Sequence, residues 1–360
     1  MTICYFGDYN SEYSRTKIIL KGLALHGVKV LHVNVRGKKG VGLFWELYQK
    51  HKELKEHYDV LFIGVGDSRL TPLLAHMIAR APVLWEPLFS IYDNWVFDRK
   101  LASPHSLKAL WYWFIDWLDC KVSDLIILDT KANAEYFHHE FGVPMKKLNW
   151  IYIGADDETF IPQKVVSKND VFEVEFHGKY IPVQGPEVIV RGAKALQEHG
   201  AHVHFTMIGS GQEGKRAQLL AHELQVKNIT FLPFMPIEEV TKYVAAADVC
   251  IGLIGDVPRV ARAIPNKLYE AAAMGKPSIN ADTPALRELF TPGNDVIAIP
   301  QGDHNALAAV IADLMQHPQK AKDIGTAARE TYLKWGTNKE VGKQTLTALE
   351  GLVGRKIDCK

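Results

Sequence analysis

The sequence predicts an α/β fold made of two consecutive halves, each built on a parallel sheet. Short β-branched runs alternate with amphipathic segments, and this strand–helix–strand order implies parallel strands. The pattern restarts after a polar stretch at residues 163–170, which we expect to be a linker. A chain of 360 residues also fits two domains, at about 150 residues each.

The first half opens with an apolar run that is followed by an amphipathic helix, and this order then repeats. The opening run breaks too soon for a signal peptide and no basic segment precedes it, so we expect a strand there. The expected strands are residues 3–6, 28–35, 60–65, 82–85 and 125–128, and the expected helices are residues 16–26 and 44–57.

The second half continues the same alternation of strands and helices. The expected strands are residues 171–176, 202–208, 228–232, 249–253, 278–280 and 296–299. The expected helices are residues 188–198, 214–224, 237–246, 266–274 and 305–316.

The composition excludes several classes of protein. The 42 Lys and Arg residues balance 41 Asp and Glu, so a net charge of +1 argues against nucleic-acid binding by bulk electrostatics. No apolar stretch approaches the ~18 residues that would span a bilayer. The four cysteines form no CxxC pair, which argues against a disulfide framework or a zinc site and fits a reducing cytoplasm; they are Cys4, Cys120, Cys250 and Cys359.

Loops beyond the carboxyl ends of parallel strands are candidate ligand sites. In the second half, Gly178 and Lys179 follow the first strand, and Gln184 and Gly185 open the next helix. A cation beside free N–H groups at a helix N-terminus can hold a diphosphate. Gly209 begins a second such loop. For both loops the alternative is a tight turn that needs glycine only for its conformation.

An Ala-rich helix at residues 266–274 begins after Pro265 and ends before Gly275. It carries Lys267 and Glu270 among apolar residues. A carboxylate on a helix that packs on both faces needs partners, which the hydroxyl pair of a ligand would supply. The alternative is a solvated i,i+3 ion pair between these two residues.

Several segments of the second half, in order, resemble the nucleotide-binding half of family 4 retaining glycosyltransferases of the GT-B fold. The resemblance covers residues 176–288 and lies in residues 178–185, 205–211, 229–234, 246–252 and 265–277. It implies two Rossmann-like domains that face each other across a cleft, with a C-terminal helix that crosses back to the first domain after Trp335 and Gly336. The domains expected are residues 1–160, 161–335 and the returning segment 336–360.

The resemblance also implies roles for particular residues. Glu270 matches the carboxylate that holds the donor ribose, and Lys179 matches the cation on the donor diphosphate. Where the family usually has a first Glu this chain has Arg262, and where a Lys is common it has Gln184. Arg259, Arg262 or Lys267 would then complete the diphosphate site together with Lys179. The full donor set is Gly178, Lys179, Gln184, Gly185, Gly209, Phe234, Arg259, Arg262, Asn266, Lys267 and Glu270.

The first half is expected to bind the acceptor and to complete the sugar pocket. Glu86 follows a strand, near a position where the family often has His, and with Asp93 it is a candidate catalytic carboxylate. The alternative for Glu86 is a solvated loop carboxylate. The residues expected on the acceptor side are Gly7, Asp8, Tyr13 and Arg15, for which the alternative is a simple helix cap.

Two aromatic stretches raise the question of membrane contact. One is the basic helix around Trp45, and the other is residues 106–120, which include Trp111. Because acceptors of the family include lipid-linked saccharides, such a face could lie on an anionic bilayer. The alternative is core packing, since six residues have helical core spacing: Leu107, Leu110, Trp111, Phe114, Ile115 and Leu118.

Together these observations predict a retaining hexosyltransferase of glycan or polysaccharide biosynthesis. Its donor would be a nucleotide diphosphate sugar and its acceptor a saccharide or a lipid-linked saccharide. We expect no metal and no other cofactor, because fixed cations can stabilise the leaving diphosphate and no convincing Asp-x-Asp pair ends a strand. The expected location is cytoplasmic, with peripheral contact at the inner membrane face.

Two alternatives remain open. One is a nucleotide-sugar epimerase of the same architecture, and the other is a sugar-nucleotide binding protein without activity, which Arg262 in place of Glu would suit. An NAD dehydrogenase is less favoured, because no strand is followed by GxGxxG and an acidic residue about 20 positions on.

Overall fold

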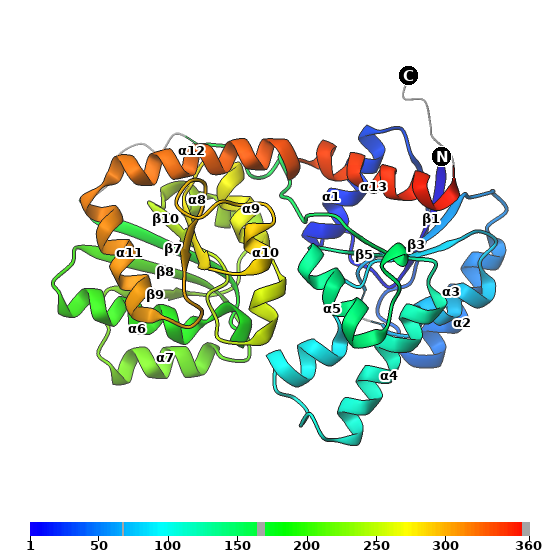
Figure 1. Ribbon diagram of the computed structural model, residues 1–360, viewed down its shortest axis with the longest axis horizontal. Coiled ribbons are helices and arrows are strands. Elements are labelled where there is room, and N and C mark those ends of the chain that lie inside the picture. The colour runs from blue at the N-terminus through cyan, green and yellow to red at the C-terminus, as the bar shows by residue number, and fades with distance from the viewer. Residues whose placement is uncertain (67, 164–169, 355–360) are drawn as a thin grey trace. The chain divides into compact units, whose positions relative to one another are not determined.

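The computed structural model describes residues 1–66, 68–163 and 170–354 (Figure 1). The chain divides into two compact units, of which the first is Met1–Gly154 with Thr337–Lys360 and the second is Ala155–Gly336. The first crossing falls before residue 160 because Ala155 already binds the second unit, where the Tyr332 hydroxyl donates to its carbonyl. The expected linker at 163–170 lies largely outside the described residues, as does Cys359.

The first unit contains a parallel sheet in the order β2-β1-β3-β4-β5-β6. All four residues of β3 are buried, as are all four of β5, which explains their unbroken apolar sequences. The strands are β1 (Thr2–Gly7), β2 (Lys29–Asn34), β3 (Val60–Ile63), β4 (Val83–Trp85), β5 (Leu125–Leu128) and β6 (Leu148–Trp150). The helices are α1 (Ser14–Leu25), α2 (Gly40–Glu53), α3 (Thr71–Ile78), α4 (Leu107–Val122), α5 (Lys131–Phe141) and α13 (Asn338–Val353).

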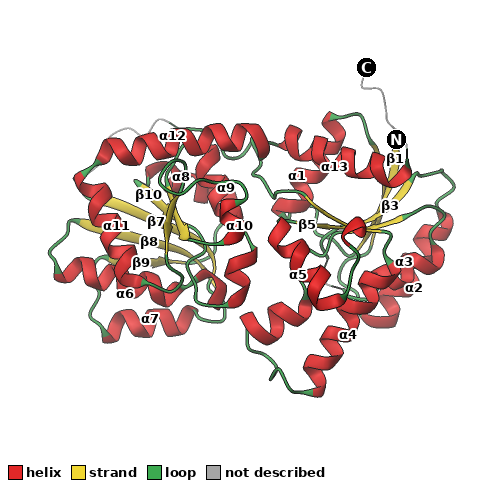
Figure 2. Ribbon diagram, viewed as in Figure 1, coloured by secondary structure: helices red, strands yellow, loops and turns green. Residues whose placement is uncertain are grey.

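The second unit contains a parallel sheet in the order β12-β11-β10-β7-β8-β9, and Figure 2 shows helices around the strands of each unit. The strands are β7 (Phe172–Lys179), β8 (Val203–Ser210), β9 (Ile229–Leu232), β10 (Val249–Ile251), β11 (Ser278–Ala281) and β12 (Ile297–Ile299). The helices are α6 (Pro186–Glu198), α7 (Gly214–Glu223), α8 (Ile237–Ala246), α9 (Asn266–Ala273), α10 (Pro284–Arg287), α11 (His304–Gln316) and α12 (Pro318–Trp335).

The sequence analysis missed three of these elements in the first unit: α3, α5 and β6. The returning C-terminal helix was expected, and α13 is that helix. Helix α5 had readable end signals, because the Thr130 side chain caps it by accepting from the Asn133 backbone N–H and Gly142 ends it at φ +63°. Strand β6 has only three residues and is defined by its pairing with β5, which is a tertiary contact.

Helix α13 brings the end of the described chain back onto α1 in the first unit (Figure 1). The two backbones meet at Gly22 and Gly342, where a Cβ on Gly342 would lie 2.2 Å from the Gly22 carbonyl carbon. Glycine is therefore required at this crossing, because any side chain would force the helices apart.

We expect Gly342→Ala to destabilise the first unit by about 1–3 kcal/mol, the usual cost of overpacking a well-packed contact. Urea unfolding followed by circular dichroism measures the change. The matched control is Gly351→Ala in the same helix, where an added Cβ meets nothing within 4 Å. That control is expected to stabilise α13 by about 0.5–1 kcal/mol. Equal effects of the two substitutions would contradict the close crossing.

Candidate functional site

The strand order of the second unit places its candidate site where β7 lies beside β10. From β7 the chain proceeds outward through β8 and β9, then returns to β10 on the other side of β7. Such a reversal opens a crevice beyond the carboxyl ends of the two central strands, where ligands of open parallel sheets bind. Residues 178–185 and 252–266 leave the sheet at these two ends.

A chain of three buried ionisable side chains joins β7 to α9 at this place. The His177 imidazole lies between two carboxylates, with Nδ1 2.8 Å from Glu175 Oε1 and Nε2 2.6 Å from Glu270 Oε2. Glu175 and His177 are two residues apart on one strand, so their side chains share a face. Their exposures are 2%, 8% and 4% for Glu175, His177 and Glu270, so solvent does little to screen the three charges.

The two carboxylates decide the charge of His177. Burial by itself lowers the pKa of the imidazole, but Glu175 and Glu270 outweigh it and raise the pKa to about 10. The imidazolium therefore persists at neutral pH and donates to both carboxylates. Glu270 is thereby held in one orientation near the carboxyl end of β7.

Lys267 is the buried cation of the same site. Its amine donates to Gln184 Oε1 and lies 4.8 Å from the centre of the Phe176 ring. Burial lowers the pKa of Lys267 to about 8, against the opposing attraction of Glu270 and Glu175. The amine also borders Gly178, since a Cβ on that glycine would lie 3.3 Å from Nζ. Gln184 stands at a position where the family commonly has a lysine. Its side chain contacts Lys267, a lysine that comes from α9.

The solvated i,i+3 pair that was the alternative for Lys267 and Glu270 is wrong. Every residue from Lys267 to Ala273 is buried, so α9 packs on all sides. Glu270 binds His177 and Lys267 binds Gln184, so each charged side chain has a partner from outside its own helix.

The glycine loops are built for close approach of backbone to backbone. Gly209 pairs with Gly178 at the ends of β8 and β7, and a Cβ on Gly209 would lie 1.9 Å from the Gly178 carbonyl oxygen. Gly185 caps α6 at φ +71°, and its Cβ would lie 2.9 Å from the Gly255 nitrogen. The tight-turn explanation therefore holds for these glycines, and it leaves room for a ligand role at the same loops.

The remaining donor candidates lie at different depths. Lys179 is exposed at the end of β7, and Arg259 and Arg262 are half-buried on the short helix η4 (Pro258–Arg262). Asn266 is half-buried at the start of α9. Phe234 is 79% exposed and follows β9, which β8 separates from β7.

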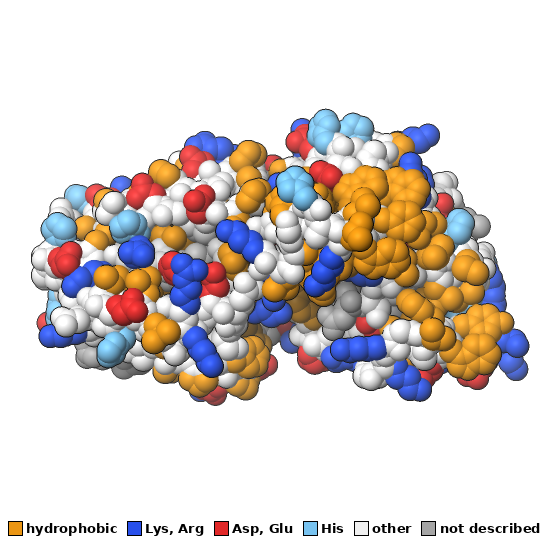
Figure 3. Space-filling view, turned by 90° about the horizontal axis from the view of Figure 1, so that it is seen from below, with side chains coloured by type: hydrophobic (Ala, Val, Ile, Leu, Met, Phe, Trp, Pro, Cys, Tyr) orange, Lys and Arg blue, Asp and Glu red, His pale blue; other side chains and the backbone are white. Residues whose placement is uncertain are grey.

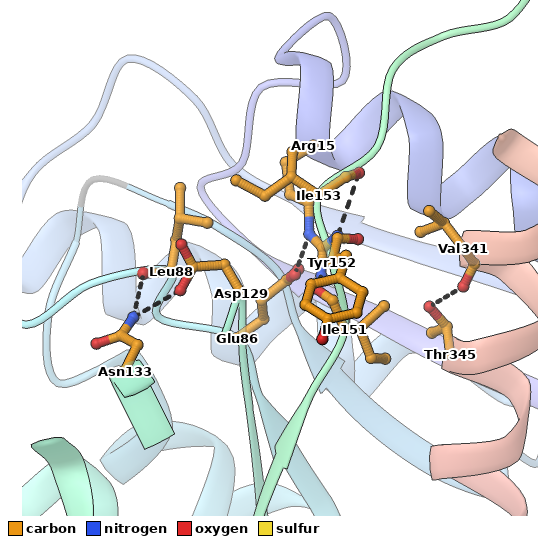
Figure 4. Close-up of polar contacts among 10 residues, drawn as sticks. All are labelled: Arg15, Glu86, Leu88, Asp129, Asn133, Ile151, Tyr152, Ile153, Val341 and Thr345. Atoms are coloured by element: carbon orange, nitrogen blue, oxygen red, sulfur yellow. Dashed lines mark hydrogen bonds and ion pairs between the residues drawn. The ribbon is translucent and has the colours of Figure 1, made fainter. Parts of the chain in front are cut away.

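In the first unit, Glu86 and Arg15 bind each other (Figure 4). Arg15 Nε donates to Glu86 Oε1 at 2.6 Å, and both side chains are 1% exposed. The solvated-loop alternative for Glu86 is therefore wrong. The expectations that Glu86 faces the sugar and Arg15 the acceptor are not met in this structure, because each charge is used by the other. Burial raises the pKa of Glu86, and Arg15 opposes the rise.

The same guanidinium fastens the segment that leaves the first unit. Arg15 Nη2 donates to the Ile151 carbonyl at 3.0 Å, and Nη1 donates to the Tyr152 carbonyl at 2.7 Å (Figure 4). These carbonyls lie between β6 and the crossing at residue 154. Arg15 therefore has a structural role here that its place after the first strand did not reveal.

Of the other first-unit candidates, Asp93 is 4% exposed at the start of the π-helical segment η1 (Asp93–Asp98). Its loop is held by Asp116 of α4, whose Oδ2 accepts from the Ser90 hydroxyl at 2.7 Å and from the Tyr92 N–H at 2.9 Å. Gly7 ends β1 at φ +137°, and Asp8 and Tyr13 are half-buried in the loop before α1.

Sequence reasoning missed Glu175, His177 and Asp116. For the first two a signal was available, because a strand expected to be buried on both faces carries ionisable residues at alternate positions. Asp116 could not be identified in this way, because its partners come from residues 90–92 and are brought to it only by folding.

Two further observations concern metals and membranes. Within the described residues, no three His, Cys, Asp or Glu side chains are grouped so that they could hold a metal ion. In the same part of the chain, no helix combines the length and the apolar character needed to cross a membrane.

Comparison with known sequences finds relatives that are named as glycosyltransferases. The family model of group 1 glycosyl transferases matches residues 157–331. A putative colanic acid biosynthesis glycosyltransferase, WcaL of Salmonella typhimurium, is 24% identical over 216 residues, or 58% of this chain and 52% of the relative. The amylovoran biosynthesis glycosyltransferase AmsK of Erwinia amylovora is 25% identical over 194 residues, or 52% and 47%. The chain spans about half the length of the curated relatives it matches.

Solved structures match over almost the whole chain. Sucrose-phosphate synthase of Thermosynechococcus elongatus has a TM-score of 0.78 at 15% identity and covers 98% of this chain and 99% of its own. HepE of Anabaena, in complex with UDP and glucose, has a TM-score of 0.73 at 16% identity and covers 97% and 99%. At these identities the matches establish the fold, which is the expected pair of Rossmann-like domains.

We expect the stabilising effect of His177 to depend on pH. Its folded-state pKa of about 10 lies above the ordinary 6.5, so its contribution is complete below pH 6.5 and is lost as the pH rises through 10. The free-energy difference between the wild type and His177→Gln, on the order of a few kcal/mol, should shrink over this window. Lys267 titrates in both proteins, so its effect largely cancels in the difference.

Urea unfolding at a series of pH values between 6.5 and 10 measures this difference. The control is His222→Gln, at an exposed position on α7, which should show no such trend. A difference for His177→Gln that stays constant across the window would mean that His177 is not held as an imidazolium.

Proposed function

Because the chain belongs to the family 4-like glycosyltransferases of the GT-B fold, we propose that it transfers a hexosyl unit from a nucleotide diphosphate sugar, with retention of configuration. The acceptor in this proposal is a saccharide or a lipid-linked saccharide. The observation that carries it is the buried Glu270, fixed by the His177 imidazolium at the reversal point of the second sheet.

Glu270 is the proposed anchor of the donor ribose. A buried carboxylate is a strong acceptor for a pair of hydroxyls, since hydrogen bonds to a charged group contribute about 1.5–3 kcal/mol. His177 supports this role by occupying Oε2 and so fixing how the carboxylate is turned. The proposal leaves the nucleotide base of the donor open. HepE is described in complex with UDP, and another relative is named as GDP-mannose-dependent.

Lys179 and Lys267 are the proposed cations for the donor diphosphate. Both lie at the end of β7, Lys179 as its last residue and Lys267 beside Gly178. Departure of the nucleoside diphosphate builds negative charge on its β-phosphate, and fixed cations stabilise that charge without reorganising. Arg259 and Arg262 on η4 are the proposed additional cations, and this assignment needs neither a metal nor another cofactor.

The first unit is proposed to hold the acceptor. Gly7, Asp8 and Tyr13 follow β1, which neighbours β3 at the reversal point of the first sheet. Asp93 remains the proposed sugar-contacting carboxylate. The names of WcaL and AmsK, in colanic acid and amylovoran biosynthesis, support glycan or polysaccharide synthesis for this chain as well. The proposed setting is cytoplasmic, with peripheral contact at the inner membrane face.

The epimerase and the inactive binding protein are separated from this proposal by one assay. Purified protein is incubated with UDP- and GDP-sugars, with and without an extract of glycolipid and oligosaccharide acceptors. Acceptor-dependent release of the nucleoside diphosphate supports transfer. Isomerisation of the donor without an acceptor would indicate the epimerase, and donor binding without turnover would indicate the binding protein.

We expect Glu270→Gln to weaken binding of the nucleoside diphosphate by about 10- to 150-fold, which corresponds to the 1.5–3 kcal/mol of a charged hydrogen-bond acceptor. Calorimetric titration with UDP and GDP measures the change. The control is Glu223→Gln at an exposed position on α7, which should bind as the wild type does. Unchanged affinity in a folded Glu270→Gln protein would remove the ribose assignment.

Transfer is expected to continue in excess EDTA, because the proposed leaving-group stabilisation comes from lysine and arginine side chains. The measurement is the rate of nucleoside diphosphate release before and after chelation. As a positive control for the cations, Lys179→Gln should lower that rate by about 100-fold or more, the usual loss when one oxyanion contact is removed. Activity that vanishes in EDTA and returns with Mg²⁺ or Mn²⁺ would contradict this assignment.

A further inference from the structure

The outward side of α4 is apolar and exposed. Leu107, Leu110, Trp111 and Phe114 are 86%, 61%, 53% and 41% exposed, and we call these four residues the α4 face. Figure 3 views the molecule from the side on which α4 lies and shows hydrophobic side chains gathered over this unit. The core-packing alternative is therefore wrong for these four residues. It holds for Ile115, which is 6% exposed, and Leu118 is half-buried.

The α4 face is extended by residues from the preceding segment. Trp95 is 39% exposed and its ring lies 5.0 Å from that of Tyr112, while Leu101 is 49% exposed. On the face itself, the Trp111 and Phe114 rings are stacked with their centres 6.0 Å apart. Exposed apolar area of this extent marks an interaction site rather than ordinary surface variation.

Charge is sorted between the two sides of this segment. Residues 93–122 contain four acids, and all four are buried, with exposures of 4% for Asp93 and 0% for Asp98, Asp116 and Asp119. The lysines of the same segment are Lys100, Lys108 and Lys121, and all three are exposed. A partner that meets the α4 face therefore meets apolar side chains and positive charge together, although the whole chain has a net charge of only +1.

We propose that the α4 face inserts into the headgroup region of an anionic lipid bilayer, with Lys100, Lys108 and Lys121 on the lipid phosphates. Tryptophan and phenylalanine are the side chains that favour this interface, and each lysine near an anionic surface adds attraction. The inference does not depend on the proposed reaction, because it rests on exposure and charge alone.

A second copy of the chain fits the same surface less well. A twofold contact through the α4 face would bring the lysines of both copies into one interface. The four acids of residues 93–122 are buried and would not offset that positive charge. The face is also the outer side of a single helix and presents protruding rings. A lipid bilayer can bury the protruding apolar side chains in its acyl region, and its anionic headgroups can bind the lysines.

Helix α2 provides a contrast within the same unit. Trp45 is 63% exposed there, and two neighbouring lysines, Lys38 and Lys50, share the one carboxylate of Glu46. Only part of the positive charge around Trp45 is thus compensated, so the difference from α4 lies in the apolar area. The exposed large hydrophobic residues of α2 are Val41 and Trp45, against four on the α4 face. Of the two aromatic stretches that the sequence marked, the structure favours α4.

The test is co-sedimentation of the full chain with phosphatidylcholine vesicles that do or do not contain phosphatidylglycerol. We expect binding only to the vesicles with phosphatidylglycerol, and weaker binding as salt is raised. The double variant Trp111→Ser with Phe114→Ser should bind about tenfold more weakly or worse, because tenfold corresponds to only about 1.4 kcal/mol and two exposed aromatic side chains bury more than that. The control Trp45→Ser should bind as the wild type does.

Circular dichroism and thermal unfolding check that both variants are folded, as expected for substitutions at exposed positions. Failure of the wild type to bind anionic vesicles would overturn the proposal. Equal binding by the double variant would overturn its location on α4. A concentration-dependent dimer that the double variant loses, without vesicle binding, would show instead that the face joins two copies of the chain.

Discussion

Burial of charge beneath the carboxyl end of β7 is the constraint on which the second unit depends. Glu175 and Glu270 are both removed from water, and an unpaired carboxylate there would cost several kcal/mol. His177 compensates both, since its two ring nitrogens each meet one carboxylate. The strand β7 and the helix α9 are thereby fixed to each other at the reversal point of the sheet, and the Glu270 carboxylate is held in one orientation.

The first unit also contains a buried pair of opposite charges, and this pair fastens a segment of the main chain. Arg15 and Glu86 form a buried pair, and the remaining guanidinium donors go to main-chain carbonyls of residues 151–153. A planar guanidinium can satisfy several acceptors at once, which a lysine could not do. The pair therefore holds the end of the first sheet to the segment from which the chain leaves this unit.

Helix α4 carries buried acids on one side and exposed aromatic residues on the other. Its acids point inward, where Asp116 orients the loop at residues 90–92 and Asp119 accepts from the Leu70 N–H. Burial raises the pKa of Asp119 to about 7, which reduces the charge that this side of the helix must carry. The aromatic side faces outward, so the pattern is the reverse of an ordinary surface helix.

The sequence by itself determined the alternation of strands and helices and the division into two α/β halves, because these follow from local periodicity. It also marked Glu270 and Lys267 as unusual, because they are a charged pair on an apolar helix. Only the tertiary structure decided which partner each charge has. Glu86 and Arg15 looked like ligand contacts because both follow strands, yet they lie 71 positions apart and neutralise each other. The core spacing of α4 likewise could not tell its inward side from its outward side, because a helix with apolar residues around most of its circumference acquires a buried face only when the rest of the chain packs against it.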